Sequence, residues 1–198
     1  MLVELTAVSQ SALPLVRLKD HLRLGSGFAD DNAQDTLLAG FLRAALKAIE
    51  SRTGRALYER EFRWSLPRWR GIGAVSLPVA PVTLVSAITI RNAAGEDTAV
   101  PAGLWQLRPD NTLHGGSQGL PRIPAGGQAQ VDFLAGYGPE FTDLPEDLQQ
   151  AVILLAAHYH DYRNDMALGA GCMPFGVTAL TEAYRHLRLS LYGAEMLQ

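Results

Sequence analysis

The sequence predicts an α+β fold, in which a bundle of about four helices carries a small antiparallel β-sheet inserted between the second helix and a long central helix. Apolar residues recur at helical spacing before residue 57 and after residue 135. Between these points lie short segments rich in β-branched and aromatic residues, separated by proline and glycine. Strands followed by a return to helix favour α+β over a parallel βαβ arrangement.

This pattern divides the chain into three parts. Residues 1–56 are expected to form an N-terminal arm and the first two helices of the helical core. Residues 57–135 are expected to form the inserted β subdomain. Residues 136–198 are expected to supply the central helix, a mobile loop and a C-terminal helix that completes the core.

The N-terminal part begins with an arm, residues 1–12, that has no periodic pattern. Its apolar residues are able either to add an edge strand to a sheet or to dock elsewhere: Leu2, Val3 and Leu5. A short helix is expected over about residues 14–24. The second helix is expected to end at Thr53, because Gly54 is a typical residue just beyond a helix. Its buried face is predicted to carry Leu38, Phe41, Leu42, Ala45 and Ile49.

The middle part contains five segments with the composition of strands. They are residues 62–66, 74–77, 85–90, 104–107 and 129–134. Residues 93–97, Ala-Ala-Gly-Glu-Asp, are typical of a hairpin turn. The stretch 113–127 is rich in glycine and is expected to be a loop.

The central helix, expected over residues 144–164, is apolar on two sides. Pro145 suits its first turn, and Glu146 and Asp147 suit the positive end of the helix dipole. One stripe carries Leu148, Ala151, Val152, Leu155, Tyr159 and Tyr162, and the opposite side carries Ile153, Leu154, Ala156 and Ala157. Such a helix has to be covered on more than one face, either inside a bundle or by another subunit. The last helix is expected over residues 177–192.

Composition and charge exclude several classes of protein. The 198 residues carry a net charge of −3, with a pI of about 5.9, so no overall basic field favours tight binding to nucleic acid. The single cysteine, Cys172, rules out an internal disulfide framework. The N-terminus lacks a signal-peptide pattern, and no apolar run approaches the roughly 20 residues that span a bilayer. We therefore expect a soluble intracellular protein without a membrane partner.

Candidate catalytic and ligand-binding residues are few. His158, His160 and Asp161 suggest a metal-dependent hydrolase, but histidines two apart point to different sides of a helix, so packed or interfacial histidines are preferred. The glycine turns lack the order of a phosphate-binding loop, and Cys172 has no nearby histidine. We therefore expect no cofactor and no enzyme.

A second pattern suggests nucleic-acid binding. Trp64, Arg68, Trp69 and Arg70 alternate aromatic and basic residues, which suits single-stranded nucleic acid. The preferred interpretation is a hairpin whose tryptophans pack on the sheet while the arginines face water.

The order of the parts resembles the head–tail connector (adaptor) proteins of long-tailed bacteriophages and gene transfer agents. The resemblance covers roughly residues 14 to 188 and rests on runs in a fixed order, none of them a catalytic signature. These runs are 19–24, Ile49–Arg55, 77–82 with the strand 85–90, 133–138, 144–159 with Arg163, and Leu180 with Tyr184-Arg185. The chain departs from the family pattern in its glycine-rich loop at 115–127 and its Gly/Met loop at 165–176.

The resemblance implies a ring, usually dodecameric, that sits on the portal vertex of a DNA-filled head, joins the head to the tail and continues the DNA exit channel. The implied partners are further copies of the chain, the portal protein, a tail-side neck or stopper protein, and DNA that passes without specific binding. The implied location is the bacterial cytoplasm before assembly and the neck of the phage or transfer particle after assembly.

Three sets of residues follow as candidates for these contacts. Subunit-interface candidates are Ile153, Leu154, Ala157 and His160. Portal-docking candidates are Tyr184, Arg185, Arg188 and Leu191. Channel-lining candidates, chosen because basic side chains would retard DNA, are Glu140, Asp143, Glu146 and Asp147.

Overall fold

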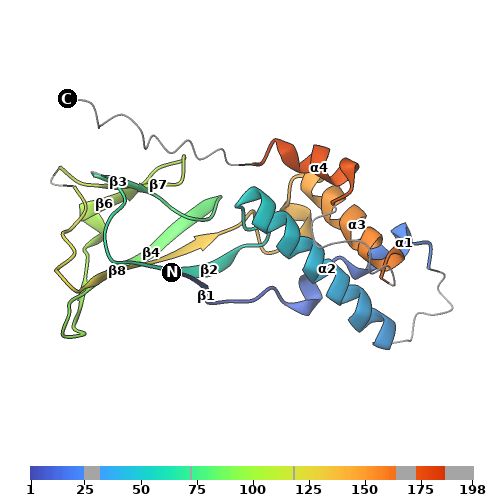
Figure 1. The fold of residues 1–198 in the computed structure, drawn as a ribbon, viewed down its shortest axis with the longest axis horizontal. Coiled ribbons are helices and arrows are strands. Elements are labelled where there is room, and N and C mark those ends of the chain that lie inside the picture. The colour runs from blue at the N-terminus through green and yellow to red at the C-terminus, as the bar shows by residue number, and fades with distance from the viewer. Residues whose placement is uncertain (25–31, 72, 118, 164–172, 186–198) are drawn as a thin grey trace, which may run out of the picture.

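The computed structural model describes residues 1–24, 32–71, 73–117, 119–163 and 173–185. The molecule is elongated, with a helical lobe at one end and a β lobe at the other (Figure 1). The expected α+β class is confirmed. The apolar interior falls into two clusters, one in each lobe, so each lobe has its own core.

The helical lobe contains α1 (Leu15–His21), α2 (Asn32–Thr53), α3 (Glu146–Asp161) and α4 (Phe175–Glu182), together with the short 3₁₀ turns η1 (Gln10–Ala12) and η4 (Phe141–Asp143). α3 packs against each of the other three helices. The end of α2 lies where the sequence places it. The Thr53 hydroxyl donates to the Ile49 carbonyl at 2.8 Å, and Gly54 adopts a φ of 68°, which favours glycine.

The end of α4 differs from the expectation. The helix begins at Phe175 and ends at Glu182, whereas a helix over 177–192 was expected. Residues 183 and 184 form a turn, and the Tyr184 carbonyl accepts a hydrogen bond from Arg55 Nε at 3.2 Å. Residues 186–192 lie outside the described residues, as does most of the loop that was expected to be mobile.

The β lobe contains two antiparallel sheets, whereas one was expected. The larger has the order β1-β2-β8-β4-β5, formed by Leu2–Glu4, Arg60–Leu66, Gln128–Ala135, Val82–Arg91 and Asp97–Ala99. The smaller has the order β3-β7-β6, formed by Ala74–Ser76, Thr112–Gly115 and Trp105–Leu107. A short 3₁₀ turn, η3 (Ala102–Leu104), precedes β6.

The second sheet is needed because the first buries only one face. In β2 the even-numbered residues are buried, and in β8 the odd-numbered ones, which places Trp64 beside Val131. Val75 and Leu113 of the smaller sheet belong to the same buried cluster. Strand β7 therefore occupies the start of the stretch 113–127, where a loop was expected, since the fully buried Leu113 outweighs its glycine neighbours.

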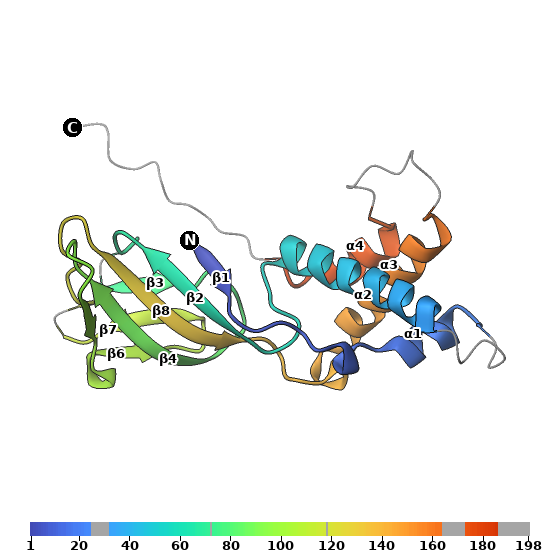
Figure 2. The same ribbon diagram turned by 90° about the horizontal axis from the view of Figure 1, so that it is seen from below.

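The arm supplies strand β1, which confirms the expected edge strand. Leu2, Val3 and Glu4 pair with Trp64, Arg63 and Phe62 of β2. The larger sheet therefore includes residues from outside 57–135, and β1 lies along its edge (Figure 2).

The chain passes between the lobes three times: from β1 to α1, from α2 to β2, and from β8 to α3. We call one region between the lobes the waist. It consists of residues 54–60, which follow α2, residues 136–140, which follow β8, and residues 79–82, which lead into β4. Backbone hydrogen bonds join the segments there, including Ala56 N–H to the Ala80 carbonyl at 2.9 Å and Glu59 N–H to the Gly138 carbonyl at 2.8 Å. Gly136 has a φ of 139°, and a Cβ there would lie 2.3 Å from the Tyr58 carbonyl oxygen, so only glycine fits.

Candidate functional site

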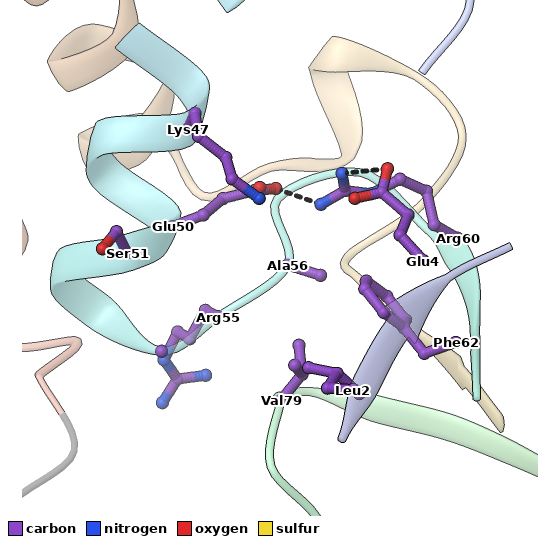
Figure 3. Close-up of a pocket in the computed structure, with 11 residues that line it drawn as sticks. Leu2, Glu4, Lys47, Glu50, Ser51, Arg55, Ala56, Arg60, Phe62 and Val79 are labelled. Carbon is purple, nitrogen blue, oxygen red and sulfur yellow. Dashed lines mark hydrogen bonds and ion pairs between the residues drawn. The ribbon is translucent and has the colours of Figure 1, made fainter. Parts of the chain in front are cut away.

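A cluster of three charged side chains holds the waist together. Arg60 extends from the start of β2 between Glu4 of β1 and Glu50 of α2 (Figure 3). Its Nη1 lies 2.7 Å from Glu4 Oε1, its Nη2 pairs with Glu50 Oε1, and its guanidinium lies 5.4 Å from the centroid of the Phe62 ring. Glu50 Oε1 also accepts the Leu57 N–H at 2.9 Å.

Arg60 is only 8% exposed, so its charge depends on these partners. Burial alone would lower the pKa of its guanidinium, but the hydrogen bonds and charges of Glu50 and Glu4 outweigh burial and raise the pKa above its ordinary value. A hollow of about 220 Å³ adjoins the cluster. Because the charged groups pair with one another, the cluster is suited to joining segments of the chain.

The subunit-interface candidates lie mainly inside the helical lobe. Ile153 is 7% exposed and Ala157 is buried, both in the cluster formed by this chain's own helices. Leu154 is partly buried against the same cluster, and the His160 ring meets the edge of Phe41 at 6.0 Å between centroids. The two apolar sides of α3 are thus covered within one chain, so their burial does not require a second subunit. A role for these residues in an interface stays a prediction.

The channel-lining candidates are all exposed near the N-terminal end of α3, but three of them have local partners. Glu140 and Asp143 form a reciprocal capping box around η4, in which Asp143 Oδ2 accepts the Glu140 N–H at 2.8 Å. Asp147 Oδ2 accepts a hydrogen bond from the Tyr184 hydroxyl at 3.2 Å. Glu146 has no interaction of its side chain among those the structure describes.

The portal-docking candidates begin beside this acidic group. Tyr184 is partly buried between Asp147 and Arg55, and burial, followed by the charge of Asp147, raises the pKa of its hydroxyl. Arg185 Nη1 forms an exposed ion pair with Glu182 at 3.0 Å. Arg188 and Leu191 lie outside the described residues.

The histidines of α3 are engaged separately. His158 packs its ring 4.6 Å from that of Tyr162, whereas His160 Nδ1 lies 3.1 Å from Asp161 Oδ1. Within the described ranges there is no group of three or more histidine, cysteine or acidic residues that could hold a metal ion. The metal-dependent hydrolase therefore has no support from this geometry.

The aromatic and basic residues of the β lobe follow the packed interpretation. Trp64 is buried, and Trp69 Nε1 donates to the Pro121 carbonyl at 2.7 Å. Arg68 and Arg70 are exposed. The tryptophan faces are thus used in the core of the β lobe, and the arrangement does not form a surface on which bases could stack.

Comparison with known proteins gives matches among solved structures. A scan of protein-family models finds no matching family, and a search of curated proteins finds no match. A chain in the neck of an empty gene transfer agent (GTA) particle, computed with C6 symmetry, is 49% identical with a TM-score of 0.87. A chain in the virion of a native GTA particle is 49% identical with a TM-score of 0.85, and one in the neck of a native particle, computed with C12 symmetry, is 45% identical with a TM-score of 0.82. Each match covers 98% of both chains.

This chain belongs to the head–tail connector family of gene transfer agents.

Because the matches cover nearly the whole chain, the helical lobe, the waist and the β lobe are all parts of the connector fold. Among the residues that the model describes, no helix of this connector combines the length and the apolar character needed to cross a membrane.

The sequence did not indicate that two arginines, Arg55 and Arg60, hold the segments of the waist together. Arg60 reaches Glu4 and Glu50, which are 56 and 10 residues away in sequence, and no spacing rule connects them. Arg55 and Glu50 do fall in the run Ile49–Arg55 that carries the resemblance to connectors. That run was the available signal, although it did not indicate what the residues contact.

Proposed function

We propose that this chain is a non-enzymatic structural adaptor that forms a ring, taken to be dodecameric, on the portal vertex and joins the DNA-filled head to the tail. The observation that carries the proposal is the match over 98% of both chains to components of GTA necks computed with C6 and C12 symmetry. A ring built by rotation uses heterologous contacts, in which one patch meets a different patch. Many such contacts on one portal act together, so each is allowed to be weak.

The ring is further proposed to continue the DNA exit channel, with exposed acidic side chains facing the DNA. Glu146 and Glu140 are exposed near the start of α3, and carboxylates there would not bind phosphate groups. DNA would then pass without specific binding. Glu146→Lys is expected to slow DNA release from assembled particles, whereas Glu61→Lys, on the exposed face of β2, should leave release unchanged. Equal release by both variants would overturn the channel assignment.

Docking on the portal is assigned to the C-terminal part of the chain, in which Tyr184 and Arg185 are the candidates that the structure describes. A tail-side neck or stopper protein is the proposed partner at the other side of the ring, and the bacterial cytoplasm is the proposed location before assembly. Arg185→Glu is expected to weaken docking. The matched control is Arg52→Glu, since Arg52 is exposed on α2.

The test is electron microscopy of the purified protein mixed with portal-bearing heads. The expected result is ring-shaped density on the portal vertex, present with the wild type and with Arg52→Glu. Heads that remain bare at protein concentrations well above those of the portal would overturn the proposal. The size of the isolated protein is not the deciding measurement, because portal contacts add to those between subunits.

A further inference from the structure

Arg55 joins more segments of the waist than its place in the sequence suggests. It follows Gly54 directly after α2, and its backbone forms a parallel bridge with Ala80. Its side chain extends away from the Arg60 cluster (Figure 3). Arg55 is also the last residue of the run Ile49–Arg55 that carries the resemblance to connectors, and none of the proposed surfaces uses it.

The side chain of Arg55 holds the end of α4. Its Nε donates to the Tyr184 carbonyl at 3.2 Å, and its Nη1 donates to the Tyr137 hydroxyl at 3.1 Å. Its guanidinium carbon lies 5.6 Å from the centroid of the Tyr184 ring. The Tyr184 hydroxyl in turn donates to Asp147 at the start of α3. The end of α4 is therefore tied to α3, to the chain after β8 and to the chain after α2.

We propose that Arg55 is a positioning residue that clamps the end of α4 to the waist and so fixes how Tyr184 and Arg185, two of the portal-docking candidates, are presented to the portal. This inference rests on the proposed function. The planar guanidinium directs several N–H groups along different lines and also stacks on an aromatic ring. A lysine ammonium in the same place keeps the charge but lacks this fork, so Arg55→Lys is not an equivalent replacement.

The clamp holds the end of α4, whereas the packing of the rest of the helix on the helical core does not depend on it. Val177 and Thr181 are buried against the helical core, and the Thr181 hydroxyl donates to the Val177 carbonyl at 2.9 Å. The hydrogen bond lies within α4, and it is the burial of these two side chains that holds the body of the helix against the core without Arg55. Removal of the clamp should therefore leave the fold intact and free only residues 182–185.

Hydrogen–deuterium exchange on the isolated protein tests the clamp. In Arg55→Ala the amides of residues 182–185 should exchange about tenfold faster, the factor expected for loss of one hydrogen bond from a charged group. The matched control, Arg52→Ala, removes an exposed arginine three residues earlier and should leave these rates unchanged. Tyr137→Phe removes one acceptor and should give a smaller acceleration, which provides a milder variant if Arg55→Ala folds poorly. Unchanged exchange rates at residues 182–185 in both Arg55→Ala and Tyr137→Phe would overturn the clamp.

Assembly on portal-bearing heads tests the positioning role. The comparison is made at equal protein concentration and at a temperature where the variants are folded. Arg55→Ala and Arg55→Lys should occupy the portal at least about tenfold less than the wild type and Arg52→Ala do. This factor corresponds to the loss of one hydrogen bond from a charged group. Faster exchange with normal occupancy would show that the clamp is real but does not position the portal contact, and would overturn the inference. A wild-type protein that fails to occupy the portal would overturn the proposed function instead, while the exchange experiment still decides whether the clamp exists.

Discussion

Replacing Arg60 with alanine is expected to destabilise the protein by about 3 kcal/mol, because it leaves a largely buried carboxylate without its partner. The Glu50 side chain is 12% exposed, and among the hydrogen bonds of the described residues the Leu57 N–H is the partner that remains after the substitution. Removal of one partner from a buried ion pair costs about 3–5 kcal/mol. The lower end applies here, since the Glu4 side chain is 31% exposed and can be solvated by water.

For a chain of this length such a loss corresponds to a fall in Tm of about 6–12 °C. The measurement is urea unfolding followed by circular dichroism, which reports on the helices, and by tryptophan fluorescence. All three tryptophans, at positions 64, 69 and 105, lie in the β lobe, so the two signals report on different lobes. Both signals should shift, since Arg60 joins the lobes.

The matched control is Arg63→Ala, on the same strand. Arg63 pairs with Asp132 through two bonds of 2.7 Å, but its side chain is 44% exposed. An exposed pair contributes at most about 1 kcal/mol. A loss of stability below about 1 kcal/mol in Arg60→Ala, or an equal loss in Arg63→Ala, would refute the conclusion that the buried cluster holds the waist together.

Three further predictions concern packing, backbone and pH. Ile153→Ala should lower the free energy of unfolding of the isolated protein by about 3 kcal/mol, and Leu154→Ala by clearly less, in urea titrations; no loss in Ile153→Ala would mean that its burial needs a second subunit. Gly136→Ala should cost more than about 3 kcal/mol or abolish soluble expression, because the new Cβ meets the Tyr58 carbonyl; a folded variant of normal stability contradicts this. Burial, followed by the charge of Glu140, raises the pKa of Tyr58 above its ordinary value of about 10, so the unfolded chain loses this proton first and stability should decline from about pH 10 upward, less steeply in Tyr58→Phe.

The ends of elements could be predicted where a local chemical rule applies. Gly54 was expected to end α2, and it does so with a positive φ. The apolar residues of the arm were expected to add an edge strand or to dock elsewhere, and two of them, Leu2 and Val3, lie in the edge strand β1. In both cases the signal lies within a few residues of the feature.

Features that depend on distant contacts could not be predicted. The second sheet was missed because Leu113 is followed by His114 and two glycines, and its complete burial comes from strands that are far away in sequence. The apolar sides of α3 were read correctly, but the pattern does not say whether the covering residues belong to the same chain. The charged cluster of the waist has no sequence spacing, since three separate elements contribute one residue each.

The independent cores of the two lobes have a consequence for how such a chain changes over evolutionary time. At the waist the lobes are joined by backbone hydrogen bonds, which almost any side chain permits, and by the side chains of two arginines, Arg60 and Arg55. Substitutions and insertions in the loops of the β lobe therefore need no compensating changes among the helices. Selection can remodel the β lobe in length and surface while the helical lobe keeps its packing, which makes the β lobe the natural place for new specificities to arise.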